Sequence, residues 1–150
     1  MIRLIIFDLD GVLVESKYLH YDALKRALLA AKSIAYTATG QSGSYFAGLI
    51  EKLGIAAEVK AKARIPAGGS TGELVAKGEA EMAVQQIPEL MATAGVELVG
   101  PLPKEVQLIT GFSAGVSTTA KQPDAASALI RFLSTPEAAR VIRAKGMEPG

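Results

Sequence analysis

The spacing of apolar residues along the chain alternates between short buried runs and a helical period. Short runs rich in Ile, Val and Leu, or alternating apolar with charged residues, predict strands. We expect strands at residues 3–7, 33–37, 59–65, 81–85, 96–99 and 107–116. Apolar residues three or four positions apart predict helices instead. We expect helices after Ser16, at about 45–53, within 67–78, and in the segments 122–133 and 135–146, and a short helix or turn at 88–94.

Residues that favour helix ends support several of these helices. Ser16 is suited to cap the first helix, and Gly54 to end the second. Thr135 and Pro136 suit the N-cap and first position of the last helix, which Gly146 would follow. The first helix carries its apolar residues on one predicted face, and these are Leu19, Ala23, Leu24, Ala27 and Leu28.

The order of strands and helices predicts an α/β fold. Strands that alternate with helices along a chain generally form a mainly parallel sheet with helices on both faces. We therefore expect one domain over residues 1–150, with three α/β/α layers, of the flavodoxin-like or periplasmic-binding-protein-lobe type. The segment 107–116 does not fit a simple strand–helix repeat, and we expect a crossing or antiparallel strand there.

The composition narrows the class of protein without identifying a partner. A chain of 150 residues, 49% of them hydrophobic, is large enough for one hydrophobic core. Its net charge of +1 and its few aromatic residues give no sign of a nucleic-acid partner. The absence of Cys excludes disulfides and thiolate metal sites. Because we find neither a membrane-spanning apolar stretch nor a signal peptide, we expect a cytoplasmic protein without a membrane partner.

Two acidic residues follow the first predicted strand, in the stretch FDLDGVLVES at residues 7–16. Asp8 and Asp10 are two positions apart, so both side chains point to the same side of an extended backbone. At the end of a parallel strand, such carboxylates face the crevice in which ligands bind. One carboxylate can attack a phosphorus atom while the other transfers a proton, with Mg²⁺ shared between a carboxylate and the phosphate.

The stretch IIFDLDGVLVES resembles motif I of the phosphatases of the haloacid dehalogenase superfamily, DxDGxLxxS, and the likeness extends to about residue 24. The resemblance implies that Asp8 is the nucleophile and Asp10 the general acid/base. It also implies that Asp8 and the backbone carbonyl of Asp10 hold Mg²⁺. That family needs an acidic pair after a later strand, and no predicted strand of this chain ends in one. We therefore expect a vestigial motif with weak Mg²⁺ binding and no required cofactor.

A second resemblance covers the rest of the chain, from about residue 23 onward. It is carried by GGSTGELVAKGEAEMAVQQIPEL, at 68–90, and by SAGVSTTAKQPDAASALIRFLSTPEAARVIRAKGMEP, at 113–149. These segments resemble the molybdate-type periplasmic solute-binding proteins of ABC transporters. The resemblance implies the second α/β lobe of such a protein and its C-terminal helices. The first lobe, the secretion signal and the usual entry strand would be missing.

The two resemblances together predict a chimera. Residues 1–24 would supply a phosphatase-like strand, loop and helix start, and residues 25–150 a binding-protein lobe. The join would lie in a helix that both families share, which keeps the core-facing spacing intact. The expected protein is then an engineered α/β domain without a physiological activity, with a natural gene fusion as the other origin. Two alternative functions are a Mg²⁺-dependent phosphatase that uses Asp8 and Asp10, and a module that binds a small oxyanion weakly.

Two segments rich in Gly and Ser precede predicted helices and are candidate anion-binding sites. Backbone N–H groups at a helix start, with hydroxyl side chains beside them, bind oxyanions. The candidate residues are Ser42, Gly43, Ser44, Ser70 and Thr71. The Ser and Thr side chains equally suit plain helix capping. Gln85 and Gln86, at the end of a predicted strand, are either ligand donors or ordinary loop amides.

The loss of a lobe would expose apolar surface that the lobe once covered. Exposed apolar patches favour self-association. We therefore expect an equilibrium between a monomer and a homodimer, which includes the domain-swapped form of the dimer.

Overall fold

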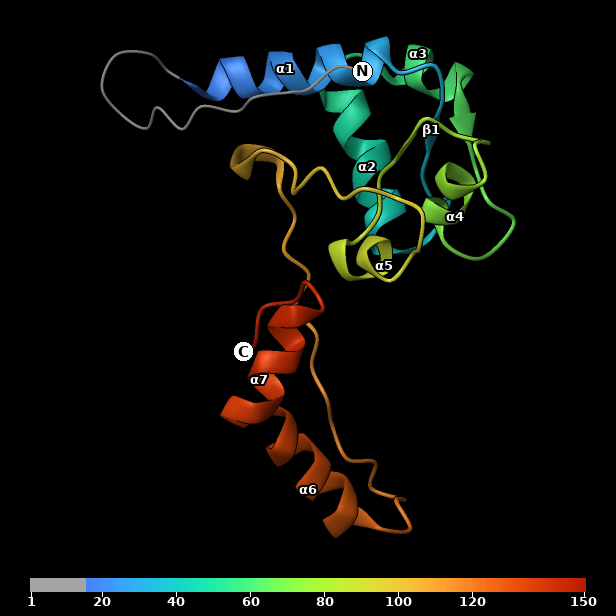
Figure 1. Cartoon of the computed structure of the whole chain (residues 1–150). Helices are drawn as coiled ribbons and strands as arrows, with labels where there is room; N and C mark the ends of the chain where they lie inside the picture. The colour runs from blue at the N-terminus through green and yellow to red at the C-terminus, as the bar shows by residue number, and fades with distance from the viewer. Residues whose placement is uncertain (1–15) are drawn as a thin grey trace.

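A small parallel sheet surrounded by helices forms the main body of the protein (Figure 1). The computed structural model describes residues 16–150, with side chains from Leu19 onward. Its strands are β1 (Ile34–Ala35), β2 (Ala63–Arg64) and β3 (Met82–Ala83). Its helices are α1 (Ser16–Ala30), α2 (Gly40–Lys52), α3 (Ala56–Ala61), α4 (Thr71–Ala76), α5 (Ile87–Met91), the 3-10 helix η1 (Lys104–Val106), α6 (Pro123–Leu133) and α7 (Pro136–Ala144). None of these described helices is long and apolar enough to span a membrane.

The sheet has the order β2-β1-β3, and both pairs are parallel. Ile34 of β1 is in register with Ala63 of β2 on one side and with Met82 of β3 on the other. The chain reaches each next parallel strand through helices, as parallel pairing requires. The predicted α/β class with a parallel sheet is therefore confirmed.

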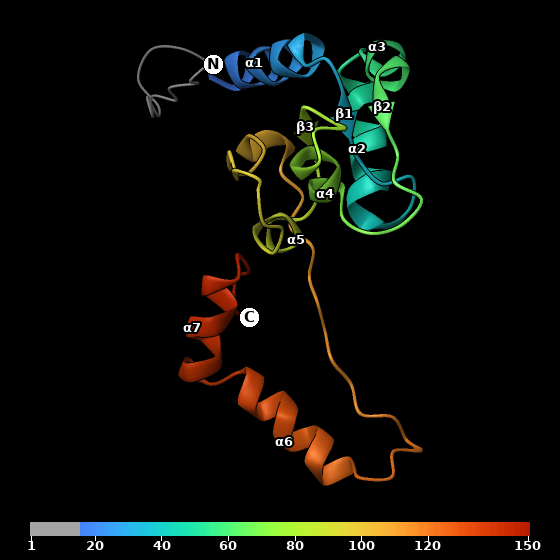
Figure 2. The same ribbon diagram turned by 45° about the vertical axis from the view of Figure 1, so that its right-hand side comes forward.

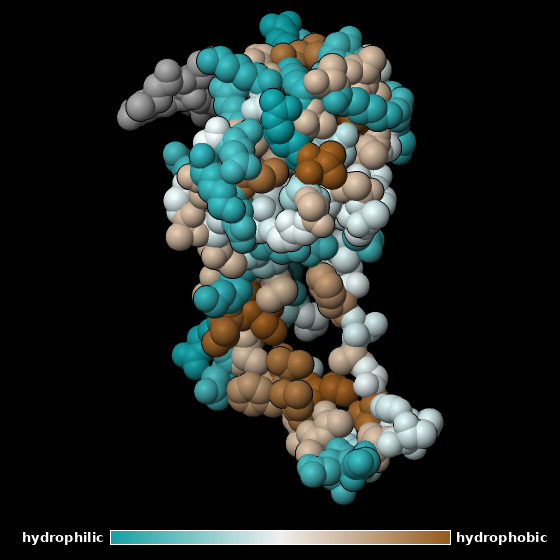
Figure 3. Space-filling view, turned by 90° about the vertical axis from the view of Figure 1, so that its right-hand side faces the viewer, coloured by the Kyte–Doolittle hydropathy of each residue, from teal (hydrophilic) through white to brown (hydrophobic). Residues whose placement is uncertain are grey.

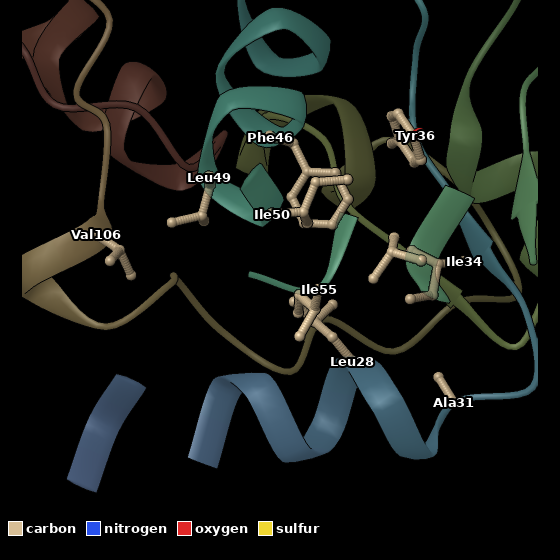
Figure 4. Close-up of a cluster of buried hydrophobic side chains, with 10 residues drawn as sticks. Leu28, Ala31, Ile34, Tyr36, Phe46, Leu49, Ile50, Ile55 and Val106 are labelled. Atoms are coloured by element: carbon tan, nitrogen blue, oxygen red, sulfur yellow. The ribbon is translucent and has the colours of Figure 1, made fainter. Parts of the chain in front are cut away.

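Both faces of the central strand are covered. Side chains of neighbouring strand residues point to opposite faces, and Ile34 and Ala35 are both 0% exposed. Ile34 belongs to a hydrophobic cluster with residues of α1, α2 and α3. This cluster contains Leu28, Ala31, Ile34, Tyr36, Phe46, Leu49, Ile50, Ile55, Val59 and Val106 (Figure 4). Helix α4 instead contacts β1 and β3.

Specific contacts fasten the outer helices to this core. The rings of Tyr36 and Phe46 pack edge to face with centroids 5.0 Å apart. The hydroxyl of Tyr45 donates a hydrogen bond of 2.6 Å to the carbonyl of Val106, which holds η1 against α2. Lys62 Nζ donates two hydrogen bonds of 2.6 Å to carbonyls at the end of α1, those of Leu29 and Ala31. Carbonyls at a helix C-terminus lack intrahelical partners, so Lys62 acts as a C-terminal cap for α1.

The C-terminal helices lie beyond the sheet. The chain leaves η1 and follows an extended path before it enters α6 and α7, which form a separate helical pair (Figure 2). Thr135 caps α7 by accepting a hydrogen bond from the Ala138 N–H, and Pro136 takes the first helical position. Gly146, with φ of 79°, follows the end of α7. The predicted boundaries of both C-terminal helices are therefore confirmed.

The predicted strand at 59–65 is wrong for most of its length, because residues 56–61 form α3 and only Ala63–Arg64 form β2. The alternation of apolar and charged residues there has a second interpretation. Ile55 and Val59 are four positions apart, and both are fully buried in the core cluster. A spacing of four places two side chains on one face of a helix, and this contact with the core decides the local structure.

Two further predicted strands, at 96–99 and 107–116, have no counterpart in the described structure. Val99, Ile109 and Phe112 are instead strongly exposed, at 87%, 78% and 74%. A strand needs a neighbour to pair its backbone groups, and the described residues offer none to these segments. The predicted strand at 3–7 lies outside the described residues.

The first two helices also differ from the prediction in detail. Helix α2 begins at Gly40 rather than near residue 45, so the predicted loop at 40–44 is its first turn. In α1, Tyr21, Leu24 and Leu28 pack on the core, whereas Leu19 is 58% exposed. Residues 21, 24 and 28 share one face of the helix. The buried face of α1 therefore differs from the predicted apolar face by a rotation of part of a turn about the helix axis.

A close approach of backbone to backbone fixes the position of α2. A Cβ atom on Gly43 would lie 2.0 Å from the carbonyl oxygen of Thr37 and 2.5 Å from the Thr37 Oγ1. Because the nearest atom belongs to the backbone that follows β1, it cannot rotate away as a side chain would. Only glycine therefore fits at position 43 with α2 seated as it is.

We expect Gly43→Ala to destabilise the protein by about 3 kcal/mol or more, since overpacking of this kind forces a backbone shift. Gly48→Ala is the matched control, because Gly48 lies in the same helix with no atom within 4 Å of its Cβ position. The control should stabilise the protein by about 0.5–1 kcal/mol through helix propensity. Urea unfolding of both variants measures the two effects, and equal stabilities would contradict the close contact.

Candidate functional site

Three loops meet at one edge of the sheet. All three strands run in the same direction, so the segments after β1, β2 and β3 emerge at the carboxyl edge. These segments lead into the first residues of α2, α4 and α5. In open parallel sheets, ligands bind outside the carboxyl ends of the strands. This edge is therefore the place where a site is expected.

The first turn of α2 presents unpaired backbone donors at this edge. Its N-cap residue, Thr39, makes no side-chain capping hydrogen bond among the described residues. The N–H groups of the first helical residues, Gly40, Gln41 and Ser42, have no intrahelical acceptor. Gly40 has φ of +81°, a conformation that favours glycine and lets the chain turn sharply into the helix. The positive end of the helix dipole adds to the attraction for an anion.

Gln85 follows β3 and lies next to the strand that leads to α2. Its Oε1 accepts three hydrogen bonds: from the Thr71 N–H at 2.9 Å, from the Thr71 hydroxyl at 2.7 Å and from the Ser70 hydroxyl at 3.3 Å. These donors fix the orientation of the amide, because its oxygen must face α4. The Nε2 group then points away from these donors. It has no hydrogen-bond partner among the described residues and is not buried.

The first residues of α4 hold Gln85 in place. Thr71 is 0% exposed, so its hydroxyl and N–H depend on the Gln85 oxygen for hydrogen bonding. Ser70 caps α4 by accepting from the Gly72 N–H at 3.2 Å and also lies 3.2 Å from the Thr93 hydroxyl. A Cβ atom on Gly72 would lie 2.9 Å from the Thr93 Oγ1, so the packing is tight there as well.

The five predicted anion-site residues fall into two groups. Ser42 lies in the first turn of α2, where its partly exposed side chain accompanies the free N–H groups. Gly43 is buried against Thr37, and Ser44 is 200° further around the helix than Ser42, which directs it elsewhere. Ser70 and Thr71 bind Gln85 rather than an open space, so the structure brings them to the site as supports.

The sequence did not single out Gly40, Gln41 or Thr93, which the structure adds to the site. Gly40 and Gln41 belong to a segment that the sequence places in a loop ahead of the helix, whereas α2 begins at Gly40. Gln86, the neighbour of Gln85, has a structural role: it precedes α5, and its N–H donates to Glu89 Oε2 at 3.3 Å.

Charged side chains pair mainly away from the donors of α2 and Gln85. Lys60 contacts Glu51 at 2.6 Å, and this hydrogen bond, followed by the charge of Glu51, raises the pKa of Lys60. His20 lies 3.4 Å from Glu105. A backbone hydrogen bond at Glu105, and then His20, lower the pKa of that carboxyl. The donors at the strand edge are therefore neutral amide and hydroxyl groups.

The predicted phosphatase residues cannot be placed. Asp8 and Asp10 lie outside the described residues. Between residues 16 and 150, the structure shows no group of three His, Cys, Asp or Glu side chains that could hold a metal ion. The Mg²⁺ site expected at Asp8 and Asp10 stays a prediction.

Comparison with known proteins identifies the larger part of the chain. The sequence profile of the family described as bacterial extracellular solute-binding protein matches residues 16–148. An aconitate isomerase from a Pseudomonas species is 34% identical over 129 residues. That alignment covers 85% of this chain and 49% of the relative, so the chain spans about half the length of the curated relative. No solved structure matches the chain.

The family match agrees with the resemblance of the sequence to periplasmic solute-binding proteins. It does not support the resemblance of the first residues to haloacid dehalogenase phosphatases. It begins at residue 16, ahead of the join expected near residue 24. The parallel α/β body is consistent with this assignment. The chain belongs to the family of bacterial extracellular solute-binding proteins.

Proposed function

We propose that this chain binds a small carboxylate or similar oxyanion at the carboxyl edge of its sheet. The binding groups are the free N–H groups of Gly40, Gln41 and Ser42 and the Nε2 group of Gln85. The observation that carries the proposal is the fixed amide of Gln85, whose oxygen is held by three donors. Its NH₂ group is thereby kept as a donor.

The relation between the strands supports the idea that both sets of donors reach one ligand. The Val84 N–H donates to the Ala35 carbonyl at 2.9 Å, which aligns the ends of β3 and β1. Gln85 therefore stands beside the residues after β1, at about the spacing of paired strands, roughly 5 Å. The segment after β1 leads from there into the first turn of α2, and we propose that an anion with several oxygens bridges the two sets of donors.

The comparisons support an anionic solute. The family is one of solute-binding proteins, and the relative is named for aconitate, a tricarboxylate. Because the chain spans about half of that relative, we propose that it supplies one side of a binding site. A site of this kind should bind weakly, since half of the donors that enclose a ligand would come from elsewhere. The family description supports secretion rather than the cytoplasmic location expected from the sequence.

We also propose that residues 1–15 have a different origin from the rest of the chain. The family match begins at residue 16, which is the last residue of the phosphatase-like motif with Asp8 and Asp10. The idea of a chimera, engineered or natural, in which the motif is a fragment, rests on the phosphatase-like motif alone. A fragment that lacks the later acidic pair would hold Mg²⁺ poorly and would stabilise a transferring phosphoryl group little.

Titration of the ¹⁵N-labelled chain with trans-aconitate, molybdate and sulfate tests the binding proposal. We expect amide signals of residues 40–42 and the side-chain NH₂ signal of Gln85 to shift, with dissociation constants in the millimolar range or somewhat lower. Gln85→Glu keeps an oxygen for Thr71 but replaces the NH₂ donor by a charged oxygen, so it should weaken binding at least tenfold. Gln122→Glu adds the same charge at the start of α6 and should bind like the parent. Shifts that avoid residues 40–42 would contradict the proposed site.

The role of the Gln85 Oε1 atom as a hydrogen-bond acceptor is tested by measuring the free energy of unfolding. Gln85→Leu removes the oxygen and leaves the buried Thr71 hydroxyl and N–H without an acceptor. We expect a loss of about 2–4 kcal/mol in the free energy of unfolding. Gln85→Glu should lose much less at neutral pH because it retains an acceptor. Chemical denaturation measures both, and equal losses in the two variants would show that the oxygen does not support Thr71.

The origin of the first residues is tested by phosphatase turnover. With a generic aryl phosphate and Mg²⁺, we expect the parent chain to show no turnover above that of Asp8→Asn. Steady-state hydrolysis rates of the two proteins, purified in the same way, make the comparison. Mg²⁺-dependent turnover that disappears in Asp8→Asn would contradict the idea of an inactive fragment.

A further inference from the structure

We propose that Met91 is an oxidation site, and that a peroxide which converts its thioether to the sulfoxide detaches helices α6 and α7 from the main body. The contact that carries the proposal joins Met91, the last residue of α5, to Gly146, just after α7. This contact lies apart from the donors of α2. The oxidation therefore does not depend on the ligand binding proposed above.

The sulfur of Met91 occupies space beside Gly146 that a side chain would need. A Cβ atom on Gly146 would lie 2.6 Å from the Met91 Sδ and 2.8 Å from the Ile87 Cγ2. It would also lie 3.6 Å from the backbone nitrogen of Pro88. The thioether therefore packs directly on the backbone at Gly146, and the end of α7 is seated against α5.

The same glycine shapes the end of α7. Gly146 has φ of +79°, a conformation that favours glycine. Its N–H donates to the Arg143 carbonyl at 3.0 Å, and the Met147 N–H donates to the Ile142 carbonyl at 3.1 Å. These two hydrogen bonds form the Schellman motif that commonly ends a helix. Because this turn is bonded to α7, a displacement of Gly146 from α5 moves the end of the helix with it.

The α6–α7 pair takes no part in the core of the main body. None of its residues belongs to the described core cluster. Leu129, Phe132 and Leu133 of α6 are exposed, and Figure 3 shows hydrophobic side chains gathered over the C-terminal helices. An extended segment links the pair to η1, and the chain after α7 returns towards α5 (Figures 1 and 2). The contact at Gly146 is therefore a principal attachment of the pair to the main body.

Met91 is accessible to an oxidant, since the residue is 47% exposed. In the reaction with H₂O₂, the sulfur attacks one oxygen, an S–O bond forms and the O–O bond breaks. The proton of the transferred oxygen passes to the other oxygen, which leaves as water. The sulfur gives up two electrons, and these reduce the peroxide. Met82 in β3 is partly buried against the core cluster, so it should react more slowly.

The sulfoxide is unsuited to the contact that the thioether makes. Oxidation adds an oxygen that accepts hydrogen bonds strongly. The neighbours of the sulfur offer no donor, because the Gly146 N–H is bonded to the Arg143 carbonyl, Pro88 has no N–H, and Ile87 contributes a methyl group. A polar oxygen without a partner is more stable in water. Since Met91 is half exposed, its oxidised side chain can turn to water, and the end of α7 then loses its seat.

Hydrogen–deuterium exchange of the full chain, before and after treatment with H₂O₂, tests the proposal. Peptide mapping by mass spectrometry gives the oxidised fraction of each methionine. Once Met91 is oxidised, we expect the amides of residues 141–147 to exchange at least about tenfold faster, because local opening sets their protection. Exchange around Ile34 should stay the same, because no residue of α5 belongs to that cluster. Methionine sulfoxide reductases should restore slow exchange.

Two variants show whether the response comes from Met91. Leucine fills a similar volume to methionine and has no sulfur to oxidise. Met91→Leu should keep the contact and exchange like the untreated parent, with or without peroxide. Met147→Leu is the matched control, because Met147 is 38% exposed near the same helix end, and it should respond as the parent does. A parent that keeps slow exchange with Met91 oxidised would overturn the proposal, as would a full peroxide response in Met91→Leu.

A third variant tests the contact without peroxide. In Gly146→Ala the new methyl group meets Ile87, whose β-branched side chain has little freedom to rotate in a helix. We expect faster exchange at residues 141–147 and faster oxidation of Met91, whose sulfur loses its cover. Gly78→Ala is the matched control, because Gly78 has φ of +75° and no atom within 4 Å of its Cβ position. Gly146→Ala and Gly78→Ala proteins that both behave like the parent would overturn the proposal.

Discussion

The pairing of β1 on both of its sides is the constraint on which the rest of the main body depends. Ile34 and Ala35 are fully buried, and their backbone groups connect β2 and β3, which contribute only two ladder residues each. Buried backbone groups must form hydrogen bonds. In β1, which has two residues, these groups pair with β2 on one side and with β3 on the other. The helices on the two faces owe their positions to this strand, and the carboxyl edge exists because all three strands share its direction.

The candidate site uses the two ends of one amide for different purposes. The oxygen of Gln85 satisfies the buried Thr71, and this bond is local and structural. The nitrogen of the same amide has no hydrogen-bond partner among the described residues, and in the proposed site it serves as a donor. Neutral donors of this kind bind an anion without a counter-charge, because hydrogen bonds and the helix dipole stabilise the negative charge. In the proposed site, Ser70 and Thr71 would therefore act on a ligand through the orientation of Gln85.

Local signals in the sequence predicted the elements that are fixed by local chemistry. The caps at Ser70 and Thr135, the stop at Gly54 and the buried run around Ile34 all agree with the structure. The sequence failed where a contact from another element decides the outcome. Residues 59–61 are helical because Val59 reaches the core beside Ile55, and an alternating pattern alone does not reveal that contact. Likewise, the Gln85 amide is oriented by residues fourteen and fifteen positions away, on another element.

The extended segment between η1 and α6 has a consequence for how the protein unfolds. The sheet and the helices that cover it are built from a continuous stretch of chain, from α1 to η1, and their contacts with one another form one cooperative unit. The helical pair after that segment adds no residue to the core cluster, and the chain after α7 meets the main body where Gly146 packs against Ile87 and Met91 of α5. Heating or denaturant should therefore separate two transitions, because the loss of α6 and α7 leaves the packing around β1 intact. A single unfolding free energy would not describe such a chain, and hydrogen exchange would protect its two parts to different degrees.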